Sequence, residues 1–344
     1  MKKSLIVLAA LGAFAGAASA QSSVTLFGIV DLSVNSIKNG STTVKRMDNN
    51  QLNSNRLGFR GTEDLGGGMT AGFWLEGALA NDVGNGGSAT GGALNFQRRS
   101  TVSLSGSFGE VRMGRDYTVN FSTMAGNDAY GANGMASPVN LYALGVAQLG
   151  TGAGTTVRAN NMVAYFLPAN LGGVYGALQI AASEGAAGDA NKFQGGRLGY
   201  AAGPVDVSVA YSQTFDATKL KDTTIGGSYN FGIAKLYAFY DQKKFNSNKY
   251  TTYAVSAGVP LGQGEFRVSY AKGNRSGGTA VQNLDDAKLW GAEYIYNLSK
   301  RTALYAQYGQ LKNEGASNLS VILTENTAAG TKSTGYGAGI RHSF

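Results

Sequence analysis

Apolar and polar side chains alternate one by one along most of this chain. Between residues 24 and 35, for example, Val24, Leu26 and Leu32 stand at even positions, while Thr25 and Asp31 stand at odd ones. Successive side chains of a β-strand point to opposite faces, so a period of two predicts strands with one apolar and one polar face. Sixteen such segments follow one another, namely 22–37, 53–64, 69–80, 95–107, 110–116, 158–168, 173–184, 193–202, 204–215, 222–231, 233–243, 250–260, 264–274, 286–298, 301–313 and 333–344.

The connections between these segments are alternately short and long. Glycine-containing turns such as 65–68 and 261–263 belong to the short set, and the long set includes 38–52, 81–94, 117–157, 275–285 and 314–332. Bacterial outer-membrane barrels place tight turns in the periplasm and long loops outside. A sheet in lipid must also close, because each unpaired backbone group there costs several kcal/mol. The pattern predicts an all-β fold, a 16-stranded antiparallel transmembrane β-barrel in the cell outer membrane.

The first twenty residues are expected to lie outside that fold. Lys2 and Lys3 precede an apolar run over 5–18, and Ala18-Ser19-Ala20 has the small-x-small form of a cleavage site. This arrangement is typical of a secretory signal peptide, and the run is shorter than the ~20 residues of a membrane-spanning helix. We therefore expect 1–20 to be a signal peptide for export and 21–344 to form the barrel.

The composition is unusual for a soluble domain, with 51 glycines, only 4 prolines, 18 tyrosines and 15 phenylalanines. The glycines lie inside alternating runs rich in aromatic and β-branched residues, which disordered chains lack. Strands whose small residues face a crowded lumen explain them better. The formal net charge is +8, or +6 without Lys2 and Lys3. Because basic residues occur singly or in pairs, we predict no nucleic-acid partner, while an anion-attracting interior remains open.

Enzymatic chemistry has almost no suitable residues here. The chain contains no cysteine, and His342 is its one histidine. A nucleophilic hydrolase would therefore have no plausible base, and we predict no catalytic residues, resident metal or cofactor. The adjacent carboxylates Glu63-Asp64 and Asp285-Asp286 stand at strand ends, where solvated turn charges are more usual than incidental calcium binding.

Several motifs resemble those of trimeric general porins of Gram-negative bacteria, of the β-proteobacterial type. They are SSVTLFG at 22–28, SNRLGFRGTEDLGGG at 54–68, FWLEG at 73–77, RRSTVSLSGSFGEVRMGR at 98–115, RANN at 158–161, SKRT at 299–302 and GIRHSF at 339–344. The resemblance covers essentially the whole mature chain. It implies a homotrimer of 16-stranded barrels, each with a long third loop folded into its lumen. The connection 117–157, by far the longest, is the candidate for that loop.

Strand alternation and this resemblance together select the basic residues expected to line the pore. Arg56, Arg60 and Arg99 lie on inward-facing positions of their predicted strands, and Arg158 opens the strand after the long loop. The resemblance places Arg56, Arg99 and Arg158 in the basic cluster at the pore constriction, with Arg60 near it. Arg98 has the opposite parity and ranks below Arg99, although a bulge would exchange the two.

Acidic residues are few in the region that would face those arginines. Asp128 is the sole carboxylate of 117–157 and is expected on the opposing wall of the constriction. This departs from the pattern of cation-selective porins and resembles the anion-selective members. Asp31 and Glu76 face inward by alternation and are expected to temper the arginines. Arg115 has outward parity, so we interpret it as a structural or interface residue.

The last segment alternates up to a terminal aromatic residue, Phe344, which we expect to act in assembly of the barrel. The predicted function is a general diffusion porin, a passive water-filled channel for small polar solutes and ions with anion selectivity, surrounded by outer-membrane lipid and lipopolysaccharide. A substrate-specific channel would need a lumenal aromatic track. Phe27 and Trp74 face inward, but the sequence traces no continuous track. An adhesive barrel with host-binding loops is the other alternative.

Overall fold

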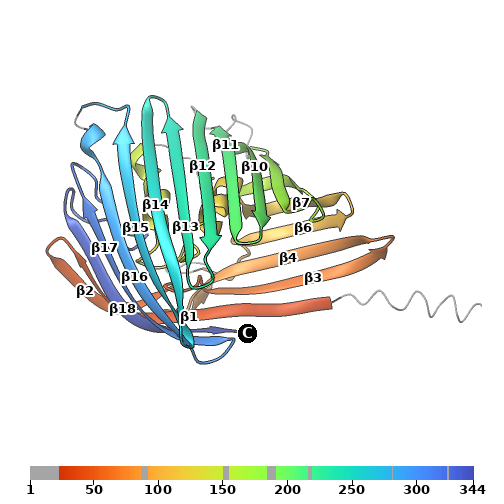
Figure 1. Cartoon of the computed structure of the whole chain (residues 1–344), viewed down its shortest axis with the longest axis horizontal. Coiled ribbons are helices and arrows are strands. Elements are labelled where there is room, and N and C mark those ends of the chain that lie inside the picture. The colour runs from red at the N-terminus through yellow and green to blue at the C-terminus, as the bar shows by residue number, and fades with distance from the viewer. Residues whose placement is uncertain are drawn as a thin grey trace, which may run out of the picture.

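A computed structural model describes residues 23–86, 92–149, 155–183, 191–215, 219–280, 282–323 and 325–344. The expected signal peptide, 1–20, lies outside the described residues. The main-chain pairing forms one antiparallel sheet closed into a barrel (Figure 1). The strands β2 (Thr42–Asn49) and β5 (Asn85–Gly86) are local hairpin additions in two of the long connections.

The other sixteen of the eighteen described strands form the barrel wall, as the alternation predicted. They are β1 (Ser23–Asn39), β3 (Arg56–Gly66), β4 (Met69–Ala80), β6 (Arg99–Gly106), β7 (Gly109–Tyr117), β8 (Arg158–Phe166), β9 (Val174–Ala181), β10 (Lys192–Ala202), β11 (Val205–Phe215), β12 (Lys219–Asn230), β13 (Lys235–Phe245), β14 (Asn248–Leu261), β15 (Gly264–Ser276), β16 (Ala287–Asn297), β17 (Thr302–Asn313) and β18 (Lys332–Ser343). A short 3₁₀ turn, η2 (Gln282–Leu284), lies between β15 and β16.

The first and last strands close the barrel. β1 pairs with β18 from Ile29↔Ser343 to Asn39↔Ser333, while its first residues, Ser23–Ile29, pair with β3. Both ends of the described chain and the short turns therefore lie at one end of the barrel, hereafter the short-turn end. Its tight turns use left-handed glycines, such as Gly203 at φ 57° and Gly262 at φ 60°, where a side chain would be strained.

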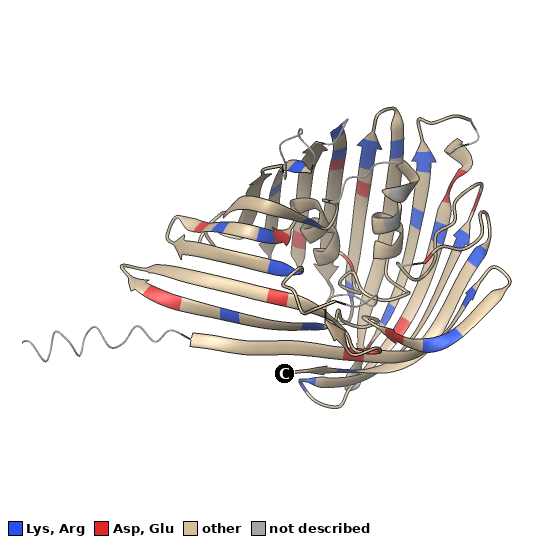
Figure 2. Ribbon diagram, turned by 180° about the vertical axis from the view of Figure 1, so that it is seen from behind, with Lys and Arg blue, Asp and Glu red and all other residues tan. Residues whose placement is uncertain are grey.

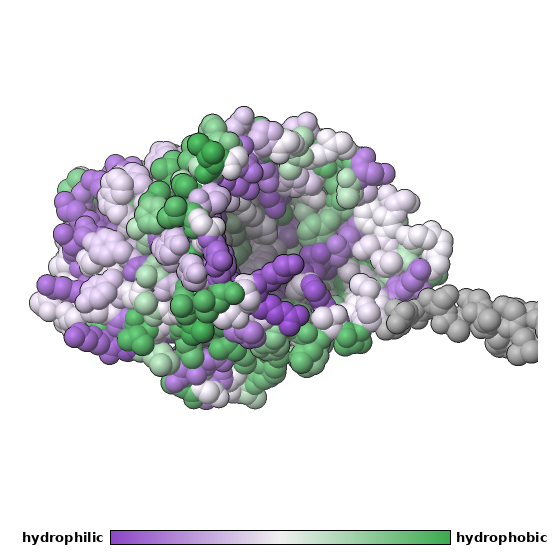
Figure 3. Space-filling view, turned by 60° about the horizontal axis from the view of Figure 1, so that its bottom comes forward, coloured by the Kyte–Doolittle hydropathy of each residue, from purple (hydrophilic) through white to green (hydrophobic). Residues whose placement is uncertain are grey.

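The two faces of the wall divide as the alternation predicted. On β1, Val34 is 65% exposed on the outside, whereas Asp31, Ser33 and Asn35 are at most 2% exposed. The large exposed apolar residues of the other strands, such as Trp290, share the outward parity. Hydrophobic groups thus face lipid and polar groups face the interior, which is hollowed and lined by hydrophilic residues at the visible mouth (Figure 3).

The segment between β7 and β8 packs against the inner face of this wall. It contains α2 (Val119–Gly126), α3 (Val139–Leu144) and the 3₁₀ turn η1 (Ala147–Leu149), and its helices lie within the curve of the sheet (Figure 2). Asn120 Nδ2 donates to Thr224 Oγ1 at 3.0 Å, and Ser269 Oγ donates to the Ala136 carbonyl at 2.5 Å. The long third connection therefore narrows the lumen from inside.

Inward-facing glycines of the wall form the seat for that segment. A Cβ on Gly291 would lie 2.4 Å from the carbonyl oxygen of Ala136, and a Cβ on Gly309 would lie 2.3 Å from that of Met135. No L side chain fits at such distances from backbone. These positions account for part of the high glycine content, since the small residues let the loop approach the strands.

A single added methyl group at this seat is expected to displace the loop. We expect Gly309→Ala to lower the temperature at which the folded barrel is lost, because overpacking costs about 1–3 kcal/mol. The measurement is the heat-induced mobility shift of the purified protein on gels. Gly196→Ala is the matched control, because its new methyl first meets a terminal methyl of Leu178 at 3.3 Å. An equal effect of both changes would contradict the seat.

Candidate functional site

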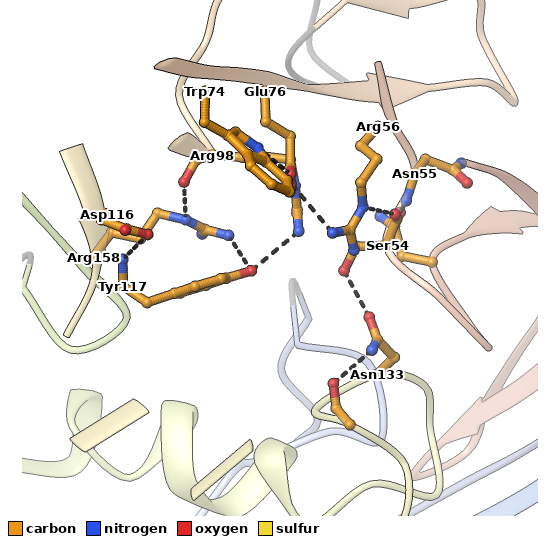
Figure 4. Close-up of polar contacts among 12 residues, drawn as sticks. Ser54, Asn55, Arg56, Trp74, Glu76, Arg98, Asp116, Tyr117, Asn133 and Arg158 are labelled. Carbon is orange, nitrogen blue, oxygen red and sulfur yellow. Dashed lines mark hydrogen bonds and ion pairs between the residues drawn. The ribbon is translucent and has the colours of Figure 1, made fainter. Parts of the chain in front are cut away.

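Three arginines lie close together on the inner wall, two of them paired with one carboxylate and the third linked to them by a tyrosine hydroxyl (Figure 4). Arg98 Nε donates to Glu76 Oε1 at 2.6 Å, and Arg56 Nη1 lies 3.3 Å from the same oxygen. Arg158 joins them through Tyr117, whose hydroxyl accepts from Arg158 Nη2 at 2.8 Å and from Arg98 Nη2 at 3.2 Å. We call Arg56, Arg98, Arg158, Glu76 and Tyr117 the arginine cluster.

Adjacent elements of the wall supply this cluster. Arg56 opens β3, Glu76 lies on β4, Arg98 directly precedes β6, Tyr117 ends β7 and Arg158 opens β8. All are therefore near the long-loop ends of their strands, beside the start of the inserted segment. Three positive groups against one carboxylate leave the cluster positive.

The structure reverses the predicted order of Arg98 and Arg99. Arg98 lies just before the first residue of β6, where strand alternation does not yet set the side-chain direction, and its amide donates to the Glu76 carbonyl at 3.0 Å. Its side chain turns into the arginine cluster. Arg99 also faces inward, but its guanidinium lies 4.5 Å from the Trp74 ring centroid and 3.5 Å from Asp116 Oδ2, further toward the short-turn end.

Sequence reasoning did not select Tyr117. Its ring stacks on Phe121 of α2 with centroids 4.8 Å apart, and the Arg158 guanidinium lies 4.3 Å above its centroid. The following residue, Thr118, caps α2 by accepting from the Phe121 amide. A tyrosine directly before a helix cap is a weak signal, because only the tertiary fold brings its hydroxyl to two arginines.

Asp128 does not face the arginines as predicted. It is 4% exposed, and its carboxylate accepts from the amides of Tyr130 and Ala132 and from the Ser137 hydroxyl, at 2.6–3.0 Å. Burial raises the pKa of the Asp128 carboxyl, and the Ser137 hydrogen bond opposes that shift. Its short side chain bonds to the nearby backbone, so it organises the loop and offers no open charge to solutes.

Asp31 faces inward as predicted but also has a structural role. It is 0% exposed, and its Oδ2 accepts from the amides of Leu52 and Asn53 at 2.7 and 2.5 Å. The Tyr305 hydroxyl donates to its other oxygen. These bonds hold the turn that leads into Arg56, so Asp31 positions an arginine and is not a free lumenal charge. Glu76, in contrast, lies within the arginine cluster.

The remaining basic candidates lie elsewhere. Arg60 stacks near Phe27 and Trp74 on the short-turn side of the cluster. Arg115 donates to the Gln97 carbonyl at 2.5 Å and to Asn160, which fits the structural role predicted for it. A basic residue that the sequence reasoning missed is Arg197 of β10, which donates to Tyr175 at 3.2 Å. It has the opposite parity to Leu198 and Tyr200, which are exposed on the outer face, so alternation alone could have placed it on the inner face.

The carboxylate pairs considered for calcium have other partners. Asp285 forms an ion pair with Arg275 at 3.1 Å and accepts from the Ala316 amide. Asp64 accepts from the Gly66 amide in its turn. Among the described residues, no group of three or more histidines or carboxylates is arranged to hold a metal ion. No helix within the described ranges is both long and apolar enough to cross a membrane.

Comparison with known proteins gives consistent matches. The family model described as Gram-negative porin matches residues 7–316. Outer membrane porin protein 32 of Delftia acidovorans is 40% identical over an alignment of 365 positions that spans 100% of both chains. An anion-selective porin from Comamonas acidovorans has a TM-score of 0.83 at 36% identity, over 94% of this chain and 100% of that one. The trimer form of OmpT from Vibrio cholerae, at 12% identity and a TM-score of 0.67 over 94% of this chain and 99% of that one, shares the fold alone.

Proposed function

Because the chain belongs to the Gram-negative porin family and is a channel of the outer membrane, we propose that it passes small polar solutes by diffusion and prefers anions. The observation that carries this preference is the arginine cluster, in which Arg56 and Arg98 pair with the carboxylate of Glu76 and Arg158 is joined to Arg98 through the Tyr117 hydroxyl. The similar porin from Comamonas acidovorans is described as anion-selective, which supports the same assignment.

The mechanism needs no conformational cycle and no catalysis. Solutes enter the wide mouths and pass the inserted segment, where pore diameter and wall charge filter them. An anion can exchange part of its hydration for guanidinium N–H groups, which are held in place by Tyr117 and Glu76. A cation meets the same groups as a repulsive belt. The proposed channel therefore acts as a filter and not as an enzyme.

The test of this proposal is the zero-current potential of the purified channel in a planar bilayer with a KCl gradient. We expect the sign of the zero-current potential to show that chloride is more permeant than potassium. A potential of the opposite sign would overturn the proposed selectivity while leaving the channel itself established.

We also propose that the protein assembles as a homotrimer, surrounded by outer-membrane lipid and lipopolysaccharide. The family resemblance of the motifs supports the trimer, and the apolar outer face of the wall supports the lipid contact. We expect the detergent-solubilised protein to have the mass of three chains and to dissociate into monomers on heating. Light scattering of the purified protein measures this mass. A monomeric particle at all protein concentrations would contradict the trimer.

A further inference from the structure

A second group of arginines lies on the inner wall, between the arginine cluster and the short-turn end. It surrounds a pocket of about 320 Å³ whose lining includes Arg60, Trp74, Arg99 and the hydroxyls of Thr25 and Ser103. Pockets that hold small molecules start at about this size, so there is room for a one-ring solute. We call this the Arg60 pocket.

The register of four strands builds the pocket. One row across β1, β3, β4 and β6 reads Thr25, Arg60, Trp74 and Thr101, and the next row toward the arginine cluster reads Phe27, Gly58, Glu76 and Arg99. Gly58 leaves space for the Phe27 ring, since a Cβ there would lie 2.4 Å from Phe27 Cζ. The phenylalanine and tryptophan meet edge to face with centroids 5.0 Å apart.

Both guanidinium groups of the pocket are held against these rings. The Arg60 guanidinium carbon lies 5.1 Å from the Trp74 centroid and 5.4 Å from that of Phe27, and Arg99 lies 4.5 Å from Trp74. Stacking on an aromatic face fixes a guanidinium plane while its N–H edge stays free for a carboxylate. A planar ring can also stack on the guanidinium face that remains open.

The charge of the pocket favours an anion. Within the described ranges, no carboxylate oxygen lies within 4.0 Å of the exposed Arg60 guanidinium. Among the described carboxylates, Asp116 is the one within 4.0 Å of Arg99, and it also pairs with Arg112. Arg99 Nε donates to Thr101 Oγ1 at 3.1 Å. Arg60 therefore keeps an available positive charge next to two aromatic rings.

We propose that the Arg60 pocket is a binding site, beside the constriction, for small carboxylates that carry a planar aromatic ring. This rests on the proposed channel function and names a solute class for it. The carboxylate pairs with Arg60 and Arg99, and the ring lies against the guanidinium and aromatic faces. Binding must be weak, because a site inside a channel has to release its solute.

The experiment uses the intrinsic fluorescence of the pocket itself. The chain has two tryptophans, and Trp290 lies on the lipid face at 58% exposure. In the purified Trp290→Phe protein, Trp74 is therefore the one remaining tryptophan, and its fluorescence can be followed selectively. We titrate it with benzoate, with cyclohexanecarboxylate, which has the charge but no π-face, and with acetate.

We expect benzoate to change Trp74 fluorescence saturably in the millimolar range. Losing the charge-assisted pair in Arg60→Gln is expected to weaken binding about tenfold. Arg197→Gln, which removes a lumenal arginine from a different strand, is the matched control and should leave the titration unchanged. Cyclohexanecarboxylate and acetate should bind more weakly than benzoate.

Three results would overturn the proposal. They are a change that never saturates, equal binding of benzoate and cyclohexanecarboxylate, and benzoate binding that Arg60→Gln leaves intact. Circular dichroism of each variant verifies that the barrel is folded. Because this readout needs no ion conduction, its failure is distinguishable from a failure of the proposed anion selectivity, which the zero-current potential reports.

Discussion

Replacing Arg158 with serine is expected to reduce the chloride preference of the channel several-fold, and Arg56→Ser and Arg98→Ser are expected to do the same. A unit charge ~4 Å away in a water-like medium contributes about 1 kcal/mol, which corresponds to roughly a fivefold change in ion concentration. The Debye length is ~10 Å at ~0.1 M salt, so the wall charges still act at the axis of a narrow pore.

The zero-current potential across a KCl gradient measures each variant. Glu76→Gln should shift the potential in the opposite direction, because it removes the one carboxylate among the three arginines. Arg301→Ser, in an exposed turn at the short-turn end, is the charge-matched control and should have little effect. If all three cluster variants retained the wild-type potential, the filter would lie elsewhere in the lumen.

Variants of Arg98 and Arg99 also test which of these two arginines belongs to the arginine cluster. The structure places Arg98 on Glu76 and Arg99 beside Trp74. We therefore expect Arg98→Ser to lower chloride preference more than Arg99→Ser does. The reverse order would return Arg99 to the position that strand alternation gave it.

Deleting Phe344 is expected to reduce the amount of folded barrel in outer membranes strongly, with little effect on conduction by the barrels that form. The amide and carbonyl of Phe344 bond to the carbonyl and amide of Gly28, both at 3.1 Å. Each such bond contributes about 1 kcal/mol net, and these two lie at the seam where the last strand meets the first. The Phe344 ring also lies over Gly28, where a Cβ would be 2.3 Å from its Cζ.

Heat-modifiable protein in isolated outer membranes is the measurement. Phe344→Tyr keeps the ring and both backbone bonds, so we expect it to assemble normally. Gly28→Val should reproduce part of the defect, because its side chain occupies the place of the ring. Unchanged yield after deletion would show that the terminal aromatic residue is dispensable for assembly.

Strand alternation is a local property, and for this reason the sequence alone determined the barrel. A period of two needs no knowledge of distant contacts, so it gave the sixteen wall strands, their inward and outward faces and the turn spacing. It also placed Arg56, Arg60 and Arg99 on the inner face. The hairpin strand β2 was missed, because it lies in the connection 38–52, where apolar and polar residues do not alternate, although it pairs with Leu32–Asn39 of β1.

The tertiary structure decided what the inward-facing charges do. Asp31 and Asp128 are both carboxylates near the lumen, yet their donors are backbone amides and hydroxyls that the fold brings to them. The Arg98 side chain faces inward, against the alternation, because this residue precedes the first residue of its strand. The Tyr117 hydroxyl accepts hydrogen bonds from arginines at neighbouring strands. Strand alternation determines whether the Cα–Cβ bond of a residue points to the inner or the outer face of the wall. Where its charged end lies depends on side-chain length and on partners distant in sequence, and only the folded barrel brings these together.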